Sequence, residues 1–170
     1  MRVALPSPRA QSSSRLAERT RRLVPALALA LFLVAVSARA QDAPTEFTVI
    51  PLSAGIHLIR AEVAAEASER AKGLMFRPYL GANQGMVFLF DEPTMQCMWM
   101  RNTLIPLSVA FIGEDGRVLN VENMQPQTEE NHCAARPARY ALEMNQGWFA
   151  RHGVAAGTKI SGLPKPPGSR

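Results

Sequence analysis

Beyond residue 40, the sequence is dominated by short runs of strand character that are separated by polar and turn-forming residues. In residues 56–64, IHLIRAEVA, successive side chains divide into two faces with a period of two, which is typical of a strand. The segment 113–116, GEDG, carries the Asp-Gly signal of a tight turn and predicts a hairpin between its flanking runs. Strands are predicted at residues 47–50, 56–64, 85–90, 95–100, 108–112, 117–124, 140–145 and 158–163.

Helical signals are few in the same region. Residues 66–76, EASERAKGLMF, are rich in good helix formers, and residues 146–153, QGWFARHG, predict a short helical turn closed by Gly153. Many short strands with one or two small helices indicate a mainly β domain, either a sandwich or a partly open barrel.

The first forty residues have the composition of a signal peptide. Six arginines between residues 2 and 22 precede the uncharged apolar run 23–38, and Ala38-Arg39-Ala40 fits a small-x-small cleavage site. The run is shorter than the ~20 residues of a spanning helix, which favours cleavage over the alternative of a retained membrane anchor. We therefore expect an exported protein, periplasmic or secreted, with a single domain at residues 41–163 and a flexible tail at 164–170. Export by the general or the twin-arginine route is left open.

The strong positive charge of the chain comes from this leader. Residues 1–40 carry seven of the nineteen basic residues and one of the fourteen acidic ones, so residues 41–170 hold twelve and thirteen, a formal charge of −1. A mature chain with that balance gives no reason to expect a nucleic-acid partner or a basic patch that binds membranes. We also expect no cofactor and, after cleavage, no segment embedded in a membrane. The sequence does not identify a protein partner or an oligomeric state.

Cys97 and Cys133 are the only cysteines, and both follow the predicted cleavage site. Export brings them to an oxidising compartment, where thiols tend to pair, so a disulfide is expected. The alternative is two free thiols that serve redox chemistry or bind a metal, although no Cys-x-x-Cys motif supports it.

Three motifs together carry a family resemblance. GLMFR (residues 73–77), GMVFLF (85–90) and WMRNTLIPL (99–107), followed by YALEMNQGWF (140–149), resemble the domain of unknown function 192 family (DUF192) over about residues 63–160. The resemblance implies a mainly β domain of sandwich or jelly-roll type and no established activity. Ser108 departs from the aspartate expected after Pro-Leu in that family, so no carboxylate role can be carried over to this position.

Residues 97–102, CMWMRN, contain the first candidate site residues. Trp99 and its methionine neighbours favour a place in the core, because Trp buries a large area and Met fills gaps. Arg101 and Asn102 are less easily explained by packing. With Arg77 and Glu143 they form either a structural ion-pair network or the polar rim of a pocket.

The preferred functional hypothesis is a non-catalytic domain that binds a small ligand or acts as an accessory protein in the envelope. In it, Trp99 is a stacking surface, and the polar contacts come from Arg77, Arg101, Asn102 and Glu143.

Two alternatives stand beside it. Soft-metal binding of Cu(I) would use the Met, Cys and His side chains of this region, which are Met95, Cys97, Met98, Met100, His132 and Cys133. A hydrolase would use Glu143 with a second carboxylate. The sequence contains no HExxH, GxSxG, P-loop or dinucleotide-binding motif, so no catalytic residue is assigned.

Overall fold

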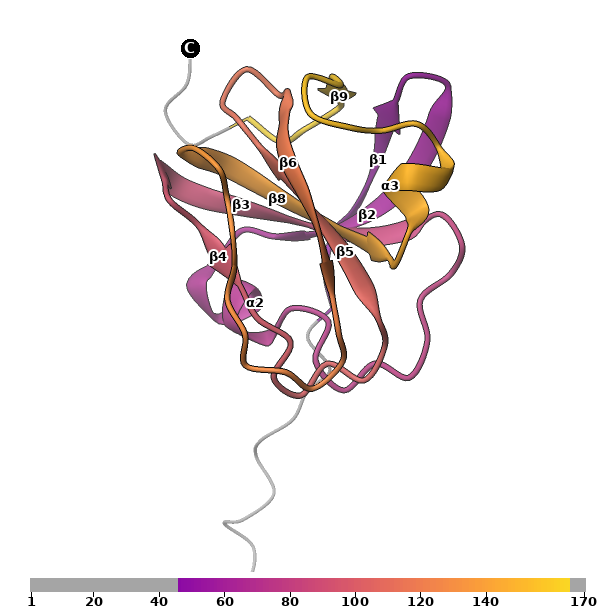
Figure 1. Cartoon of the computed structure of the whole chain (residues 1–170), viewed down its shortest axis with the longest axis vertical. Helices are drawn as coiled ribbons and strands as arrows, with labels where there is room; N and C mark the ends of the chain where they lie inside the picture. The colour runs from indigo at the N-terminus through magenta and orange to yellow at the C-terminus, as the bar shows by residue number, and fades with distance from the viewer. Residues whose placement is uncertain (1–45, 166–170) are drawn as a thin grey trace, which may run out of the picture. The chain divides into compact units, whose positions relative to one another are not determined.

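The computed structural model describes residues 46–165 (Figure 1), so the predicted signal peptide lies outside the described residues. Nine strands and two short helices occupy this range, which confirms the mainly β class. The strands are β1 (Val49–Ala54), β2 (His57–Ala64), β3 (Gln84–Thr94), β4 (Cys97–Met98), β5 (Leu107–Ile112), β6 (Val118–Met124), β7 (His132–Cys133), β8 (Ala138–Asn145) and β9 (Ile160–Ser161). The helices are α2 (Ala67–Lys72) and α3 (Trp148–Arg151).

Seven strands form one curled sheet in the order β6-β5-β8-β3-β2-β1-β9, while β4 and β7 pair separately (Figure 1). Strands β2 and β3 are parallel, and the chain between them passes through α2. A parallel pair needs such a crossover, whereas the other neighbours are antiparallel. The period-two patterns predict the strands but not which of them pair in parallel.

The two edges of the sheet approach each other at one end. An isolated bridge joins Arg117 to Lys159, and the Val118 N–H donates to the Thr158 carbonyl at 2.9 Å. The curl therefore forms a half-barrel, the partly open alternative of the two predicted architectures. Its interior is filled by side chains from both edges and from α3, including Trp148 and Phe149.

A second apolar cluster covers the opposite face of the central strands. Met86 and Phe88 of β3, Val109 of β5 and Ala141 of β8 belong to it. The segment after α2 and the turn after β4 lie over this face and contribute Leu74 and Met100. This outer layer, and not the barrel interior, holds the candidate site.

Several element boundaries differ from the prediction. Helix α2 ends at Lys72, short of the predicted residue 76, because Gly73 takes a positive φ of 47° and stops the helix. A capping box between Glu66 and Glu69 fixes its start. Strand β4 has two residues where six were predicted, and the first strand begins at Val49.

Ser108, the departure from the family pattern, is fully buried and structural. Its hydroxyl donates to Asn123 Oδ1 at 2.6 Å and accepts from the Gly147 N–H at 2.9 Å. Near the C-terminus, the Tyr140 hydroxyl donates to the Pro164 carbonyl at 2.9 Å, so the chain stays attached to the sheet through residue 164. Among residues 46–165, no helix is long and apolar enough to cross a membrane.

Candidate functional site

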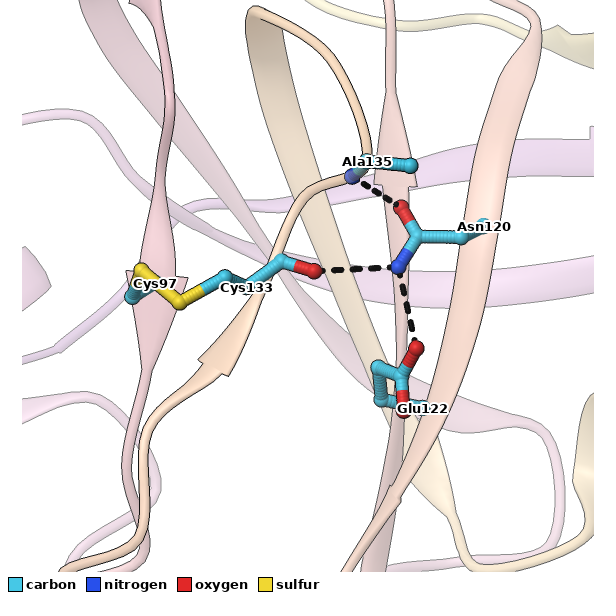
Figure 2. Close-up of a disulfide and its surroundings, with 5 residues drawn as sticks. All are labelled: Cys97, Asn120, Glu122, Cys133 and Ala135. Atoms are coloured by element: carbon cyan, nitrogen blue, oxygen red, sulfur yellow. Dashed lines mark hydrogen bonds between the residues drawn. A yellow bond between two sulfur atoms is a disulfide. The ribbon is translucent and has the colours of Figure 1, made fainter.

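Cys97 and Cys133 form a disulfide, as predicted, and it links the two short strands β4 and β7 (Figure 2). The cysteines are direct partners across this antiparallel pair, with their Cα atoms 4.0 Å apart, and Met98 is opposite His132. Because each strand has only two residues, the covalent bond is the principal restraint on this ribbon, which we call the disulfide ribbon (Cys97–Met98 and His132–Cys133).

One side chain of the main sheet anchors this ribbon (Figure 2). The Asn120 amide of β6 donates to the Cys133 carbonyl at 3.0 Å and accepts from the Ala135 N–H at 2.9 Å. The same amide group donates to Glu122 Oε1 at 3.1 Å. The position of the ribbon relative to the sheet is therefore fixed at Cys133 and at the residues that follow it.

A cavity of about 250 Å³ lies beside the disulfide ribbon, over the outer face of β3 and β8. Its walls come from the end of α2, the segment after it, and the start of the β4 segment. The lining residues are Arg70, Ala71, Lys72, Gly73, Leu74, Met75, Phe88, Phe90, Cys97, Met98, Trp99, Thr103 and Glu143. Most of this lining is apolar, as is usual for a small-molecule site.

Glu143 is the one carboxylate in this lining. It sits on β8 between Met86 of β3 and Val109 of β5, in the middle of the outer apolar layer, and is only 4% exposed. Burial raises the pKa of the Glu143 carboxyl from 4.5 to about 8, because the ionised form is poorly solvated there.

Trp99 lies at the rim of the cavity, and the prediction that it belongs to the core is wrong. It is 42% exposed, while Met100 next to it is fully buried in the outer layer. The Arg101 guanidinium carbon lies 4.1 Å from the Trp99 ring centroid, and its Nε donates to Glu129 at 2.9 Å. The tryptophan that fills the core is Trp148.

The remaining predicted polar residues do not converge on Glu143. Arg77 forms a two-pronged ion pair with Glu62 of β2, one prong at 2.7 Å, and its guanidinium lies 5.9 Å from the Phe47 ring. Arg77 is therefore part of a structural ion pair with β2, an inner strand of the sheet.

Asn102 has a backbone role. It takes a positive φ of 59° in the turn after β4, a conformation that Asn tolerates better than most residues. Its carbonyl accepts from the Phe76 N–H at 2.8 Å, which joins this turn to the segment after α2. Of the five predicted ligand-binding residues, Trp99 and Glu143 line the cavity, and Arg77, Arg101 and Asn102 do not.

Arg70 and Gly73 are among the cavity residues that sequence reasoning missed, because local pattern does not place them there. Arg70 donates to the Leu89 carbonyl and to Asp91, each at 3.0 Å, and also to the Ala65 carbonyl. Gly73 faces Phe88, and a Cβ on it would lie 3.2 Å from that ring. The GLM motif thus supplies the space in which Phe88 packs at the cavity wall.

The geometry gives little support to the two alternative functions, Cu(I) binding and carboxylate-based hydrolysis. The sulfur atoms of Cys97 and Cys133 are bonded to each other, so this structure offers no thiolate to copper. No group of three His, Cys, Asp or Glu side chains within residues 46–165 could hold a metal ion. The lining of the cavity includes no second carboxylate near Glu143, as a glycosidase-type pair requires.

Two other hollows lie away from these residues. One of about 460 Å³ is formed by the C-terminal segment with Tyr140 and Lys159, and one of about 480 Å³ lies between Ser108 and α3. Both are larger than the cavity at Glu143. Neither contains a buried carboxylate or a residue predicted to bind a ligand.

The solved structures that are similar to this chain include two bacterial proteins. A protein of unknown function from Novosphingobium aromaticivorans DSM 12444 is 40% identical, with 74% of this chain and 94% of that chain covered and a TM-score of 0.67. A Sinorhizobium meliloti 1021 protein, provisionally named a transcription regulator, is 32% identical, with 70% and 97% covered and a TM-score of 0.65. No curated protein matches the chain. Residues 49–162 match the family described as Uncharacterized ACR, COG1430 (DUF192), which the sequence motifs predicted, and the chain belongs to this family.

Proposed function

We propose that this chain is an exported, non-catalytic binding protein of the bacterial envelope and that its ligand occupies the cavity between Trp99 and Glu143. The observation that carries the proposal is Glu143, a carboxyl group that is buried in the outer apolar layer, lines this cavity and has its pKa raised by burial to about 8. A buried carboxyl group at a cavity wall, with a strongly perturbed pKa, is a candidate contact for a bound molecule.

Trp99 supports the same assignment. A half-exposed indole at the rim of an apolar cavity offers a flat surface against which a small molecule can stack. Arg101 covers one side of this indole and limits its motion. Stacking on Trp99 and a polar contact at Glu143 would together hold a ligand in the cavity.

Export is the second part of the proposal. Its support is the arginine-rich leader, the apolar run and the Ala38-Arg39-Ala40 cleavage site, together with a disulfide that persists in oxidising compartments. The provisional name of the Sinorhizobium meliloti protein would suggest DNA binding. The formal charge of −1 on residues 41–170 argues against transferring that role to this chain.

Mass spectrometry of the protein isolated from the periplasm without reductant tests both parts. We expect a chain that begins at Gln41, lacks two protons because of the disulfide, and carries a small molecule in its native mass. A chain that keeps residues 1–40 and fractionates with membranes would replace export and release with membrane anchoring.

The binding part is tested with two aromatic substitutions. Trp99→Ala should lose the bound molecule and keep the thermal midpoint of the native protein, because the indole is at the rim and not in the core. Tyr79→Ala is the matched control, since Tyr79 is more exposed than Trp99 and is not part of the cavity lining. Equal ligand retention by both variants would rule out this cavity as the binding site.

A further inference from the structure

The buried polar side chains of the cavity lining limit the chemistry of its ligand. Besides Glu143, the buried residue Thr103 contributes a polar side chain to the lining. The other side chains of the lining are mainly apolar, apart from Arg70 and Lys72 of α2. A ligand that fills this space is therefore mainly apolar and has its polar atoms next to Glu143 and Thr103.

The surroundings of Glu143 favour its neutral form. Its cross-strand neighbours Met86 and Val109 are apolar and fully buried, so they provide no charge to stabilise a carboxylate. The positive groups that line the same cavity are Arg70 and Lys72 of α2. Arg70 is already bonded to two backbone carbonyls and to Asp91.

A neutral carboxyl group has one O–H that can donate. Leaving that donor unsatisfied in an apolar site costs free energy, which an acceptor on a ligand recovers. An amine would instead require the ionised carboxylate and would bring a third positive group beside Arg70 and Lys72. The site thus discriminates between uncharged acceptors and cations of the same shape.

We propose that the cavity binds a small uncharged molecule with an aromatic or apolar body and one carbonyl-type oxygen, which accepts a hydrogen bond from the protonated carboxyl group of Glu143. This inference rests on the proposed function, because it specifies the ligand of the same cavity. The volume of about 250 Å³ is slightly below the ~300–1,000 Å³ of drug-sized sites and suits a ligand of one ring. Trp99 and Phe88 provide aromatic surface for that ring.

The proposed chemical class of the ligand is tested with four single-ring probes of similar size, which are acetophenone, toluene, benzylamine and benzoate. They are titrated into the disulfide-intact exported protein, and the indole N–H resonances of both tryptophans are followed by NMR. Trp99 reports on the cavity, while Trp148 lies in the barrel interior and is the internal control. We expect acetophenone to bind roughly tenfold more tightly than toluene, the worth of one good hydrogen bond, and more tightly than both charged probes.

Glu143 variants make the hydrogen bond itself testable. In the native protein the affinity for acetophenone should fall about tenfold per pH unit above pH 8, because ionisation removes the donor. Glu143→Gln should keep binding and lose this pH dependence, since an amide donates at every pH. Glu143→Leu should reduce acetophenone to the affinity of toluene. An unchanged Trp148 resonance shows that each variant is folded.

The outcomes separate the inference from the proposed function. Equal binding of acetophenone and toluene, or preference for benzylamine with affinity that rises with pH, overturns the proposed ligand class and keeps the cavity as a binding site. Preference for benzoate also overturns the proposed ligand class and keeps the cavity as a binding site. It would indicate an anionic ligand that binds near Arg70 and Lys72. If no probe shifts Trp99 at about 10 mM, a concentration that detects weak fragments, the cavity is not a small-ligand site and both proposals fail.

Discussion

The Arg101 guanidinium lies over the Trp99 ring, 4.1 Å from its centroid, and pairs with Glu129 at its other side. Arg101 does not line the cavity and therefore acts on it only through the indole. This contact gives a physical reason for an exposed tryptophan with a fixed orientation. It also explains why residues 97–102 combine aromatic and charged side chains.

Arg101→Met should increase the mobility of Trp99 and weaken probe binding modestly, by about twofold to fivefold, because an exposed cation–π contact contributes roughly 0.5–1 kcal/mol. The free energy of unfolding should change by less than about 1 kcal/mol, since the ion pair with Glu129 is solvent-exposed. Time-resolved anisotropy of Trp99, with Trp148 replaced by Phe, measures the mobility. Glu129→Gln is the control, and it should leave the indole contact in place.

Loss of the disulfide should destabilise the domain. The bond closes a loop with a sequence separation of 36 residues, for which chain entropy predicts a contribution of about 4 kcal/mol. Cys97→Ser/Cys133→Ser should therefore lower the free energy of unfolding by a few kcal/mol in chemical denaturation. Amides of the disulfide ribbon should lose protection from hydrogen exchange first, because two-residue strands add little of their own.

Reductant provides the control for that variant. It should lower the stability of the native protein toward that of the double serine variant and leave the variant itself unchanged. Equal stability of the native and serine proteins would show that Asn120 and the packing of the main sheet hold this region without the covalent bond.

Glu143 should make stability depend on pH. The pKa of its carboxyl is about 8 in the folded protein and 4.5 without burial, so between these values the folded state keeps a proton that the unfolded chain releases. The free energy of unfolding therefore falls as the pH rises from about 4.5 to 8, by an amount on the order of 5 kcal/mol. Glu143→Gln removes this slope and is more stable than the native protein at pH 8.

Urea denaturation at several pH values measures the effect. Glu130→Gln, at an exposed position, is the matched control and should keep the native slope. A native slope that is also unchanged in Glu143→Gln would mean that Glu143 is solvated in solution and is ionised at neutral pH.

The strands and their faces were predictable because the pattern is local. Residues 140–145 alternate as expected: Tyr140, Leu142 and Met144 enter the barrel interior, and Ala141 lies in the outer layer. The disulfide was also predictable, because the chain has only two cysteines and an apparent export signal. These inferences require no knowledge of how the strands are ordered.

The candidate site could not be predicted without knowing the order of the strands in the sheet. Glu143 and Trp99 line the same cavity because β8 is central in the sheet and the turn after β4 folds across its outer face, which the spacing of 44 residues along the chain does not indicate. The expected group of Arg77 with Glu143 fails for the same reason. The parallel pairing of β2 and β3 and the crossover through α2 bring Arg77 to Glu62.

The Arg77–Glu62 pair gives a final prediction that distinguishes structure from binding. Both side chains are partly buried, at 32% and 20% exposure, and the two-pronged geometry makes the pair stronger than a typical surface ion pair. Arg77→Met should cost about 1–2 kcal/mol in the free energy of unfolding, and Glu62→Gln a similar amount. The double variant should cost less than the sum of the two, because each single change leaves one charge without its partner.

Probe binding should be unaffected by Arg77→Met, since Arg77 does not line the cavity. The acetophenone titration of Trp99 therefore provides a second, independent measurement on the same variants. A loss of affinity in Arg77→Met with an intact thermal midpoint would return Arg77 to the binding site. It would mean that the segment after α2 moves toward Glu143 when a ligand is bound.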